Sequence, residues 1–360
     1  MPAWRDRWRD LLSWLSRWRY PVIGGALAAL LVVFVFARAA RSPRPSYLPR
    51  RSWSLFWRPM VMGFYENGNS WGSFTAHARQ IQIASPYWYR IDAAGNLTDD
   101  TREPVVTATA HQKGVAVWPL VGNSGQDPMD NAKTRANMAS TILRLVNSRD
   151  YQGVLIDFEL LAPQSRDDLS TFLNSLGSRL HAMGKGLGVA VFPKVGIAQQ
   201  MSHPYDYLAL GKVTDAVVLM TYDHHYQGGP PGPIAPLDWV RNNLQFALAR
   251  IPHERIYLGA AAYGYDWTSQ GASNTVSTRQ AQNTLKKIGK QPIWDTVAQE
   301  YHFAYTDAVG VVHNIWYEDQ RSFAQKLALA RASRIGGVAI WELGFENPDI
   351  WRQVQRGHLL

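Results

Sequence analysis

Short apolar runs separated by amphipathic stretches fill the chain from residue 60 onward. Nearly continuous apolar runs are typical of parallel strands that helices cover. Eight such runs stand out, at residues 61–65, 81–87, 115–121, 154–160, 187–192, 216–222, 256–263 and 338–345. Eight strands alternating with helices predict a (β/α)8 TIM barrel of the α/β class. A doubly wound open sheet is the alternative.

The stretches between the runs carry helix signals. Ser165 is predicted to be an N-cap, with Asp167 and Asp168 in the first turn. Gly184 is expected to end this helix, whose apolar residues are Leu169, Phe172, Leu173, Leu176 and Leu180. Asp238 is predicted to cap a second helix, with apolar residues Val240, Leu244, Ala247, Leu248 and Ile251.

The interval between the seventh and eighth runs is too long for one helix. Residues 302–319 are predicted to form a strand, a turn at residues 307–310 and a second strand. We therefore expect a small α+β insertion at about residues 268–316, inside a barrel domain at residues 60–354.

The N-terminal region differs from the rest of the chain. Residues 21–37 are apolar and uncharged, long enough for a transmembrane helix. They follow a basic, aromatic-rich segment at residues 1–20 and precede a linker at residues 38–59. This pattern predicts an uncleaved membrane anchor. The alternative is secretion after cleavage near Ala39, because Ala37 and Ala39 give a small-x-small cleavage pattern. Five Arg on each side of the apolar run leave its orientation open.

The net charge of +9 comes almost entirely from this N-terminal region. Residues 1–51 hold ten Arg and two Asp, which leaves 27 basic and 26 acidic residues in 52–360. A nearly neutral domain gives no indication of nucleic-acid binding. The chain has no Cys, which excludes disulfides, thiol catalysis and Cys-ligated metals.

Two acids lie near the end of the fourth predicted strand, in the segment GVLIDFELL at residues 153–161. Alternate strand residues share a face, so Leu155, Asp157 and Glu159 face the barrel interior, and residues such as Leu160 pack under helices. Barrel enzymes carry catalytic groups at the C-terminal ends of their strands. Two carboxyl groups beside an apolar core do not both ionise readily, so one is expected to stay protonated near neutral pH. By spacing alone, an exposed strand end or a cation site is equally compatible.

The segment YQGVLIDFE at residues 151–159 resembles the strand-four signature D-x-x-D-x-D-x-E of glycoside hydrolase family 18. Four further segments resemble strands of the same chitinase-like family, in the right order: GFYENG (63–68), DAVVLMTYD (215–223), AYGYDW (262–267) and GGVAIWELGFE (336–346). The bacterial, peptidoglycan- and spore-associated branch is the most similar. The sequence departs from the signature at Gln152 and Leu155, where the family has Asp.

The resemblance implies a retaining mechanism in which the substrate's own acetamido group is the nucleophile. Glu159 is then the general acid and base, Asp157 orients the acetamido group, and Tyr222 hydrogen-bonds to its oxygen. Trp341 forms the floor under the sugar. Further candidate substrate-binding residues are Tyr65, Asp223, Tyr263 and Trp267.

Several of these residues, and a few others, also have a simpler structural interpretation. Tyr65 fits strand packing, Asp223 fits a turn, and Trp118, Tyr263 and Trp267 fit either core or sugar platforms. His224 and His225 are interpreted as loop residues rather than metal ligands. Because Leu155 cannot hydrogen-bond, Asp157 is expected to turn toward Glu159 or toward a donor on another strand.

We expect a hydrolase of β-linked, N-acetylglucosamine-containing glycan, such as peptidoglycan, poly-N-acetylglucosamine or chitin. A non-catalytic glycan-binding barrel is the alternative. We expect a monomer without metal, cofactor or nucleic acid, held in the membrane by residues 21–37, with the barrel outside the cytoplasmic membrane, where such a substrate lies.

Overall fold

A computed structural model describes residues 59–66, 68–125, 127–129 and 131–359. The predicted N-terminal segment, anchor and most of the linker lie outside these residues, so they stay predictions. In the part of the chain that is described, no helix has the length and apolar character needed to cross a membrane.

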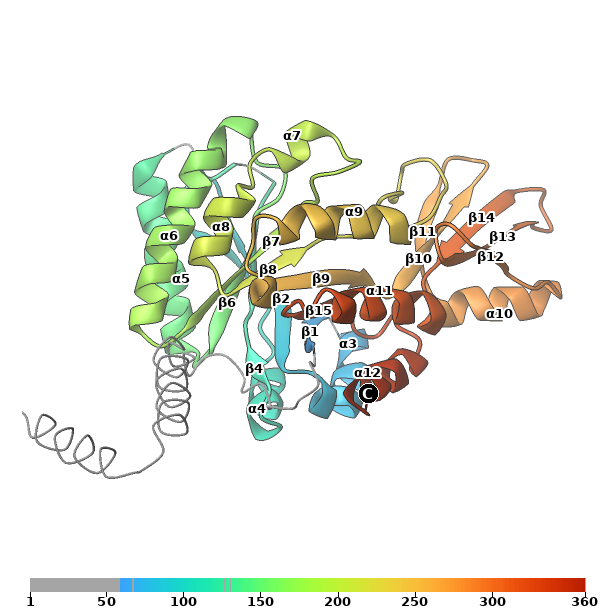
Figure 1. Ribbon diagram of the computed structural model, residues 1–360, viewed down its shortest axis with the longest axis horizontal. Coiled ribbons are helices and arrows are strands. Elements are labelled where there is room, and N and C mark those ends of the chain that lie inside the picture. Colours follow the sequence, from blue (N-terminus) through green and yellow to red (C-terminus); the bar gives the residue numbers. More distant parts are fainter. Residues whose placement is uncertain (1–58, 67, 126, 130, 360) are drawn as a thin grey trace, which may run out of the picture. The chain divides into compact units, whose positions relative to one another are not determined.

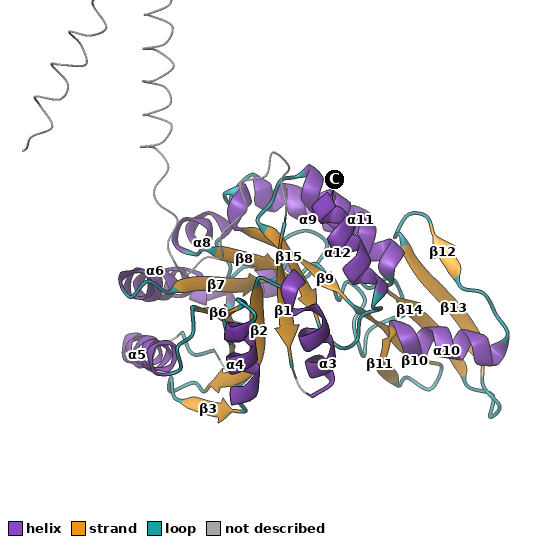
Figure 2. Ribbon diagram, turned by 90° about the horizontal axis from the view of Figure 1, so that it is seen from below, coloured by secondary structure: helices purple, strands orange, loops and turns teal. Residues whose placement is uncertain are grey.

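Eight parallel strands form a closed barrel (Figure 2). The ring closes because β1 pairs with both β2 and β15, through the registers Met62↔Ile83 and Val61↔Val338. Closure confirms the TIM barrel and rules out the open sheet. In ring order the strands are β1 (Met60–Tyr65), β2 (Ile83–Ile91), β5 (Leu120–Asn123), β6 (Gly153–Asp157), β7 (Gly186–Val191), β8 (Ala216–Leu219), β9 (Ile256–Ala261) and β15 (Gly337–Trp341).

Helices surround the barrel and cover the outer faces of its strands (Figure 1). They bury their apolar stripes against these faces in one large core cluster. The helices are α3 (Gly68–His77), α4 (Pro104–Gln112), α5 (Ala132–Ser148), α6 (Arg166–Ala182), α7 (Gln199–Ser202), α8 (Tyr207–Val213), α9 (Leu237–Leu248), α11 (Gln320–Ala332) and α12 (Asp349–Leu359).

The two predicted helices are present, but their capping differs. The apolar stripe predicted for α6 is buried, and Gly184 follows the helix with a positive φ of 68°. Ser165 precedes α6 without capping it, because its hydroxyl donates instead to Asp127 Oδ2 at 2.6 Å. Asp238 lies inside the first turn of α9 rather than before it, where acidic residues also favour the helix dipole.

The barrel interior is a packed apolar core rather than a channel. Trp118 is completely buried there, so it is a core residue and not a sugar platform. Gly153 makes room for the indole, because an added Cβ there would lie 2.6 Å from it, and Gly188 makes room for Leu155, because an added Cβ there would lie 2.8 Å from that side chain. The fully buried Leu155 is therefore part of the apolar core inside the barrel.

Several strands end earlier than the apolar runs predict. Sheet pairing stops at Asp157 in β6, at Leu219 in β8 and at Trp341 in β15. The third run is divided by Pro119, which has no N–H to donate to a sheet, into a short strand β4 (Ala116–Val117) and β5. The apolar residues beyond these points leave the sheet and form the loops at the C-terminal end of the barrel. A further strand, β3 (Leu97–Asp100), pairs antiparallel with β2 and was not predicted.

The predicted insertion is a separate antiparallel sheet with one helix, to one side of the barrel (Figure 1). It begins at residue 263 rather than 268, because barrel strand β9 ends at Ala261 and the chain then enters the second sheet. Tyr263 and Trp267 thus belong to the insertion. Its elements are β10 (Tyr263–Thr268), β11 (Ser273–Ser277), α10 (Thr278–Ile288), β12 (Ile293–Asp295), β13 (Glu300–Thr306) and β14 (Val312–Tyr317).

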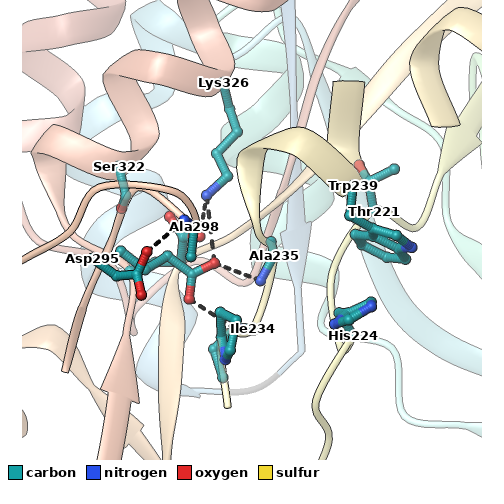
Figure 3. A network of polar contacts seen from close by, with 12 residues as sticks. Thr221, His224, Ile234, Ala235, Trp239, Asp295, Ala298, Ser322 and Lys326 are labelled. Atoms are coloured by element: carbon teal, nitrogen blue, oxygen red, sulfur yellow. Dashed lines mark hydrogen bonds and ion pairs between the residues drawn. The ribbon is translucent and has the colours of Figure 1, made fainter. Parts of the chain in front are cut away.

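A buried charge cluster connects the insertion to the barrel. Lys326 on α11 forms an ion pair with Glu318, and its Nζ lies 3.9 Å from Oε1 of Glu300 on β13. The Glu300 carboxylate also accepts the backbone N–H groups of Ile234 and Ala235, at 2.8 and 2.7 Å, from the loop after β8. Figure 3 shows Lys326 approaching this cluster from one side and the Ile234–Ala235 segment from the other. The cluster therefore holds β13 against the loop that follows a barrel strand.

Candidate active site

Asp157 and Glu159 lie at the C-terminal end of β6. Asp157 is the last residue of the strand, and Glu159 lies beyond it, because the chain leaves the sheet between them. The side-chain amide of Asn123, at the end of β5, replaces the sheet hydrogen bonds that the Glu159 backbone no longer makes. It donates to the Glu159 carbonyl at 3.0 Å and accepts the Glu159 N–H at 2.9 Å. This reciprocal pair fixes the backbone of Glu159.

A second hydrogen bond holds the residue between the two acids. The hydroxyl of the buried Tyr205 donates to the carbonyl oxygen of Phe158 at 2.7 Å. Leu160 then adopts a positive φ of 53° and is 69% exposed, so its predicted packing under the helices is wrong. The turn imposed by Asn123 and Tyr205 directs Leu160 to solvent instead.

Burial and nearby negative charges raise the pKa values of both acids. Burial, followed by the nearby charge of Glu159, raises the pKa of Asp157 well above its usual range. Burial, followed by the charge of Asp223, raises the pKa of Glu159. A buried carboxyl group disfavours ionisation, and a second negative charge adds to that cost. Such a pair suits proton donation near neutral pH.

One oxygen of Asp157 has no hydrogen bond. Its Oδ1 is buried and finds no partner anywhere in the described chain. The expected turn toward a donor on Glu159 or on another strand is therefore not seen for this atom, and the apolar Leu155 offers none from the same strand. A buried acceptor without a partner is costly, so a hydrogen-bond donor on a bound molecule would stabilise this oxygen.

Asp223 joins the barrel to the insertion. It follows β8 with a positive φ of 56°, and its Oδ1 accepts hydroxyl hydrogens from Tyr263 at 2.5 Å and Tyr265 at 2.9 Å. Burial nevertheless raises the pKa of Asp223, against these two hydrogen bonds, which lower it. Tyr222 lies beside it, and its pKa is raised by burial and then by Asp157 and Asp223. The ends of β6 and β8 thus bring these groups together.

Trp341 is only partly buried and lies where two apolar clusters meet. It packs against the barrel interior and against the aromatic cluster of β10, and Tyr222 does the same. Its ring meets that of Phe64 edge to face, with centroids 5.1 Å apart. An accessible aromatic ring at the end of β15 suits a sugar-binding floor.

Three other predicted binding residues are buried. Tyr65 is completely buried between β1 and the helices, and its hydroxyl donates to Glu103 at 2.9 Å. Tyr263 and Trp267 are only 3% and 4% exposed. Their side chains bond to Asp223 and to the carbonyl of Tyr226. The structure therefore places all three behind the accessible surface, and of the three Tyr263 bonds to the site residue Asp223.

Sequence reasoning missed several residues that the fold brings to the acids. Besides Asn123 and Tyr205, these are Tyr265 and Tyr87. Burial raises the pKa of Tyr87, Arg90 opposes this, and Asp157 and Glu159 raise it further, which places Tyr87 near both carboxylates. The period of two from Ile83 on β2 was a usable signal for Tyr87, since both pack with the barrel interior. Asn123, Tyr205 and Tyr265 carried no local signal.

Gln152 replaces a family Asp at the start of β6. Its Oε1 accepts the N–H of Val117 at 2.9 Å and contacts His111 Nε2 at 3.2 Å, and its amide donates to the Asp150 carbonyl. Gln152 therefore links neighbouring strands. Among the described residues no group of three or more His, Asp or Glu is arranged to hold a metal ion. His224 packs on Trp239, and His225 contacts the Pro233 carbonyl.

A closed (β/α)8 barrel with a buried carboxylate pair and an accessible Trp at the C-terminal strand ends defines a glycosidase type of site. The chain is a member of that class: residues 61–346 match glycosyl hydrolases family 18, so it belongs to this family.

Similar proteins place the chain more closely within the family. It is 33% identical to the cortical fragment-lytic enzyme of Bacillus anthracis over 279 residues, which cover 72% of this chain and 64% of that protein. The crystal structure of the Bacillus cereus spore cortex-lytic enzyme SleL matches with a TM-score of 0.78 and 27% identity, over 84% of this chain and 75% of that one. A Chromobacterium violaceum chitinase matches with a TM-score of 0.77 and 26% identity, over 84% and 99%. The chain is thus related to cortex-lytic enzymes and to chitinases.

Proposed function

We propose that this glycoside hydrolase cleaves β-linked glycans that contain N-acetylglucosamine, with retention and with help from the substrate. The observation that carries the proposal is the buried Oδ1 of Asp157, which has no partner in the described chain and lies beside Glu159. An acetamido N–H is a donor that satisfies this oxygen. A sugar that carries an acetamido group therefore supplies the hydrogen-bond donor that Asp157 Oδ1 lacks.

The chemistry follows from the placement of these groups. Glu159 gives its proton to the leaving glycosidic oxygen, and the acetamido carbonyl oxygen forms a bond to the anomeric carbon as the glycosidic bond breaks. Asp157 accepts the acetamido N–H and stabilises the positive charge that develops. Tyr222 hydrogen-bonds to the acetamido oxygen, and Trp341 supports the ring. Water then attacks the anomeric carbon, Glu159 takes its proton, and the acetamido group is restored.

We propose peptidoglycan as the first substrate, and the names of two relatives support this choice. The names of two of them, cortical fragment-lytic enzyme and spore cortex-lytic enzyme, concern material of the spore cortex, and a third relative is a chitinase. We propose that this chain acts on N-acetylated wall glycan first and on chitin-type oligosaccharides second. Poly-N-acetylglucosamine is a further polymer that the same chemistry allows.

Acetylation of the cleaved sugar is expected to be essential. An ammonium group cannot act as the internal nucleophile, so fully deacetylated glucosamine oligomers should release no reducing ends where acetylated oligomers and peptidoglycan do. A thiazoline mimic of the cyclised intermediate should inhibit. Reducing-end assays across this panel test the proposal. Efficient cleavage of the deacetylated oligomer would contradict acetamido participation, and binding without cleavage of any member would favour the non-catalytic glycan-binding barrel.

The cellular location is a separate proposal. We propose that residues 21–37 anchor the protein and that the barrel lies outside the cytoplasmic membrane, with secretion after cleavage near Ala39 as the alternative. Protease added to cells with opened outer layers should then digest the barrel. Complete protection while the cytoplasmic membrane stays intact would contradict this location.

A further inference from the structure

A cavity lies among the helices, apart from the carboxylates at the end of β6. Its volume is about 650 Å³, within the usual range for small-molecule sites. It lies between the start of α6, the segment after β7 that includes α7, the start of α8 and the end of α9. Helices α6 and α8 lie side by side in both ribbon views (Figures 1 and 2). Asp157, Glu159, Tyr222 and Asp223 do not line it.

The cavity is adjacent to the catalytic segment without being part of it. Tyr205 lines the cavity, while its hydroxyl donates to the Phe158 carbonyl at 2.7 Å. Phe158 separates Asp157 from Glu159 in the chain. One buried side chain therefore stands between this cavity and the backbone of the catalytic pair.

The charged side chains of the cavity are mostly cationic. Arg166, Lys194 and Arg250 line it, and Asp206 is the one carboxylate among its lining residues. Asp206 Oδ2 pairs with Arg166 at 2.7 Å, and its Oδ1 accepts two backbone N–H groups at the start of α8. Two positive charges therefore remain. This excess is local, because residues 52–360 hold 27 basic and 26 acidic residues.

Lys194 and Arg250 have no carboxylate partner in the described chain. Lys194 Nζ donates to the Ser202 carbonyl and lies 5.3 Å from the centre of the Tyr207 ring. The Arg250 guanidinium stacks on Phe246 at 3.6 Å. Burial and the charge of Arg166 lower the pKa of Lys194 to about 8, with Asp206 opposing and Arg250 adding to the effect. Crowded like charges of this kind are stabilised when an anion binds.

We propose that this cavity binds a phosphate monoester. A phosphate monoester carries about −1.5 to −2 charges near neutral pH, which matches the two unbalanced cations better than the single charge of a carboxylate. Arg and Lys are the usual partners of its oxygens. The cavity is larger than one phosphate needs, and Tyr207 and Phe246 give it aromatic walls for the esterified group. A free sugar phosphate and a phosphorylated glycan end share this chemistry.

Calorimetry with the full chain at pH 7 and low salt tests the proposal directly. Inorganic phosphate and glucose 6-phosphate are the probes, and acetate and glucose are the controls. We expect glucose 6-phosphate to bind more tightly than inorganic phosphate, and both controls to give no binding. Chitobiose 6-phosphate distinguishes the sources: equal or tighter binding than glucose 6-phosphate indicates a glycan end, and weaker binding indicates a free sugar phosphate. Equal binding of acetate, or no binding of either phosphate at millimolar concentration, would overturn the proposal.

Two variants locate the binding. Arg250→Gln removes an exposed cation that has no ion pair in the described chain, so the fold should persist, and phosphate affinity should fall at least tenfold. Lys194→Met should have a similar effect. Arg241→Gln is the matched control, because Arg241 is an exposed residue of α9 outside the cavity. Unchanged affinity in Arg250→Gln would refute the site. Phosphate affinity is the only quantity measured in these variants, so the test of the cavity does not depend on glycan hydrolysis.

Discussion

Replacing Glu159 with Gln is expected to reduce hydrolysis of N-acetylated glycan by at least ~10²-fold while leaving glycan binding in place. The amide keeps the shape and the backbone contacts to Asn123, but it has no acidic proton to give to the leaving oxygen. Reducing-end release and calorimetric titration with an acetylated oligosaccharide measure the two effects separately. Asp167→Asn, an exposed carboxylate of α6, is the control and should keep full activity. Comparable turnover in Glu159→Gln would end its assignment as the proton donor.

The assignment of Glu159 as the proton donor also predicts how activity depends on pH. Glu159 can donate only while protonated, so activity should be lost as the pH rises through its pKa. Burial and then the Asp223 carboxylate raise that pKa. Asp223→Asn removes the charge, so the Glu159 pKa should fall and the alkaline limb of kcat/KM should move to lower pH. If the alkaline limb of kcat/KM stays at the same pH in Asp223→Asn, a group other than Glu159 determines it, and this holds for any change in the maximal rate.

Lys326→Met is expected to destabilise the protein by ~3–5 kcal/mol, because it leaves buried carboxylates without their cation. Glu300 is completely buried and Glu318 is 2% exposed, and Glu318 Oε2 already has no partner in the described chain. Urea unfolding measures the loss. Lys287→Met, an exposed lysine of α10, is the matched control and should change stability by less than ~0.5 kcal/mol.

The pH dependence of this loss has a definite sign. Burial and the Glu318 charge already raise the Glu300 pKa to about 8, although Lys326 lowers it. A carboxyl group whose pKa is raised by folding stabilises the fold while it is protonated, and this stability is lost as the pH rises from the unfolded value to the folded one. Lys326→Met should therefore be closer to wild type at pH 5 than at pH 8. Adding Glu318→Gln should restore part of the stability, and a loss that is equal at both pH values would contradict this account.

Much of the site follows from local sequence. A period of two placed Asp157 on the inner face of β6, and position at a strand end indicated catalysis, because parallel strands bring their C-terminal ends together. The order of the motifs that contain Tyr222 and Trp341 predicted family 18, and the family match confirms this prediction. The roles of these residues stay predictions that the variants above test.

The long-range partners were beyond such reasoning. Asn123 lies 36 residues before Glu159, and Tyr265 lies 42 residues after Asp223, yet their hydrogen bonds shape the site. A residue's own neighbourhood does not reveal which distant donor will reach it. Tyr65 looked like a lining residue and is buried, because the direction of a side chain at a strand end depends on what packs there.

The sequence by itself determined the eight strands, their order along the chain and the acids at the end of the fourth, because parallel strands that are buried on both faces appear as nearly continuous apolar runs. Only the tertiary structure decided where each strand stops. Sheet pairing ends when another group satisfies the backbone, as Asn123 does for Glu159. It also decided that Lys194 and Arg250 share a cavity although 56 positions separate them, since that proximity depends on how the helices pack around the barrel.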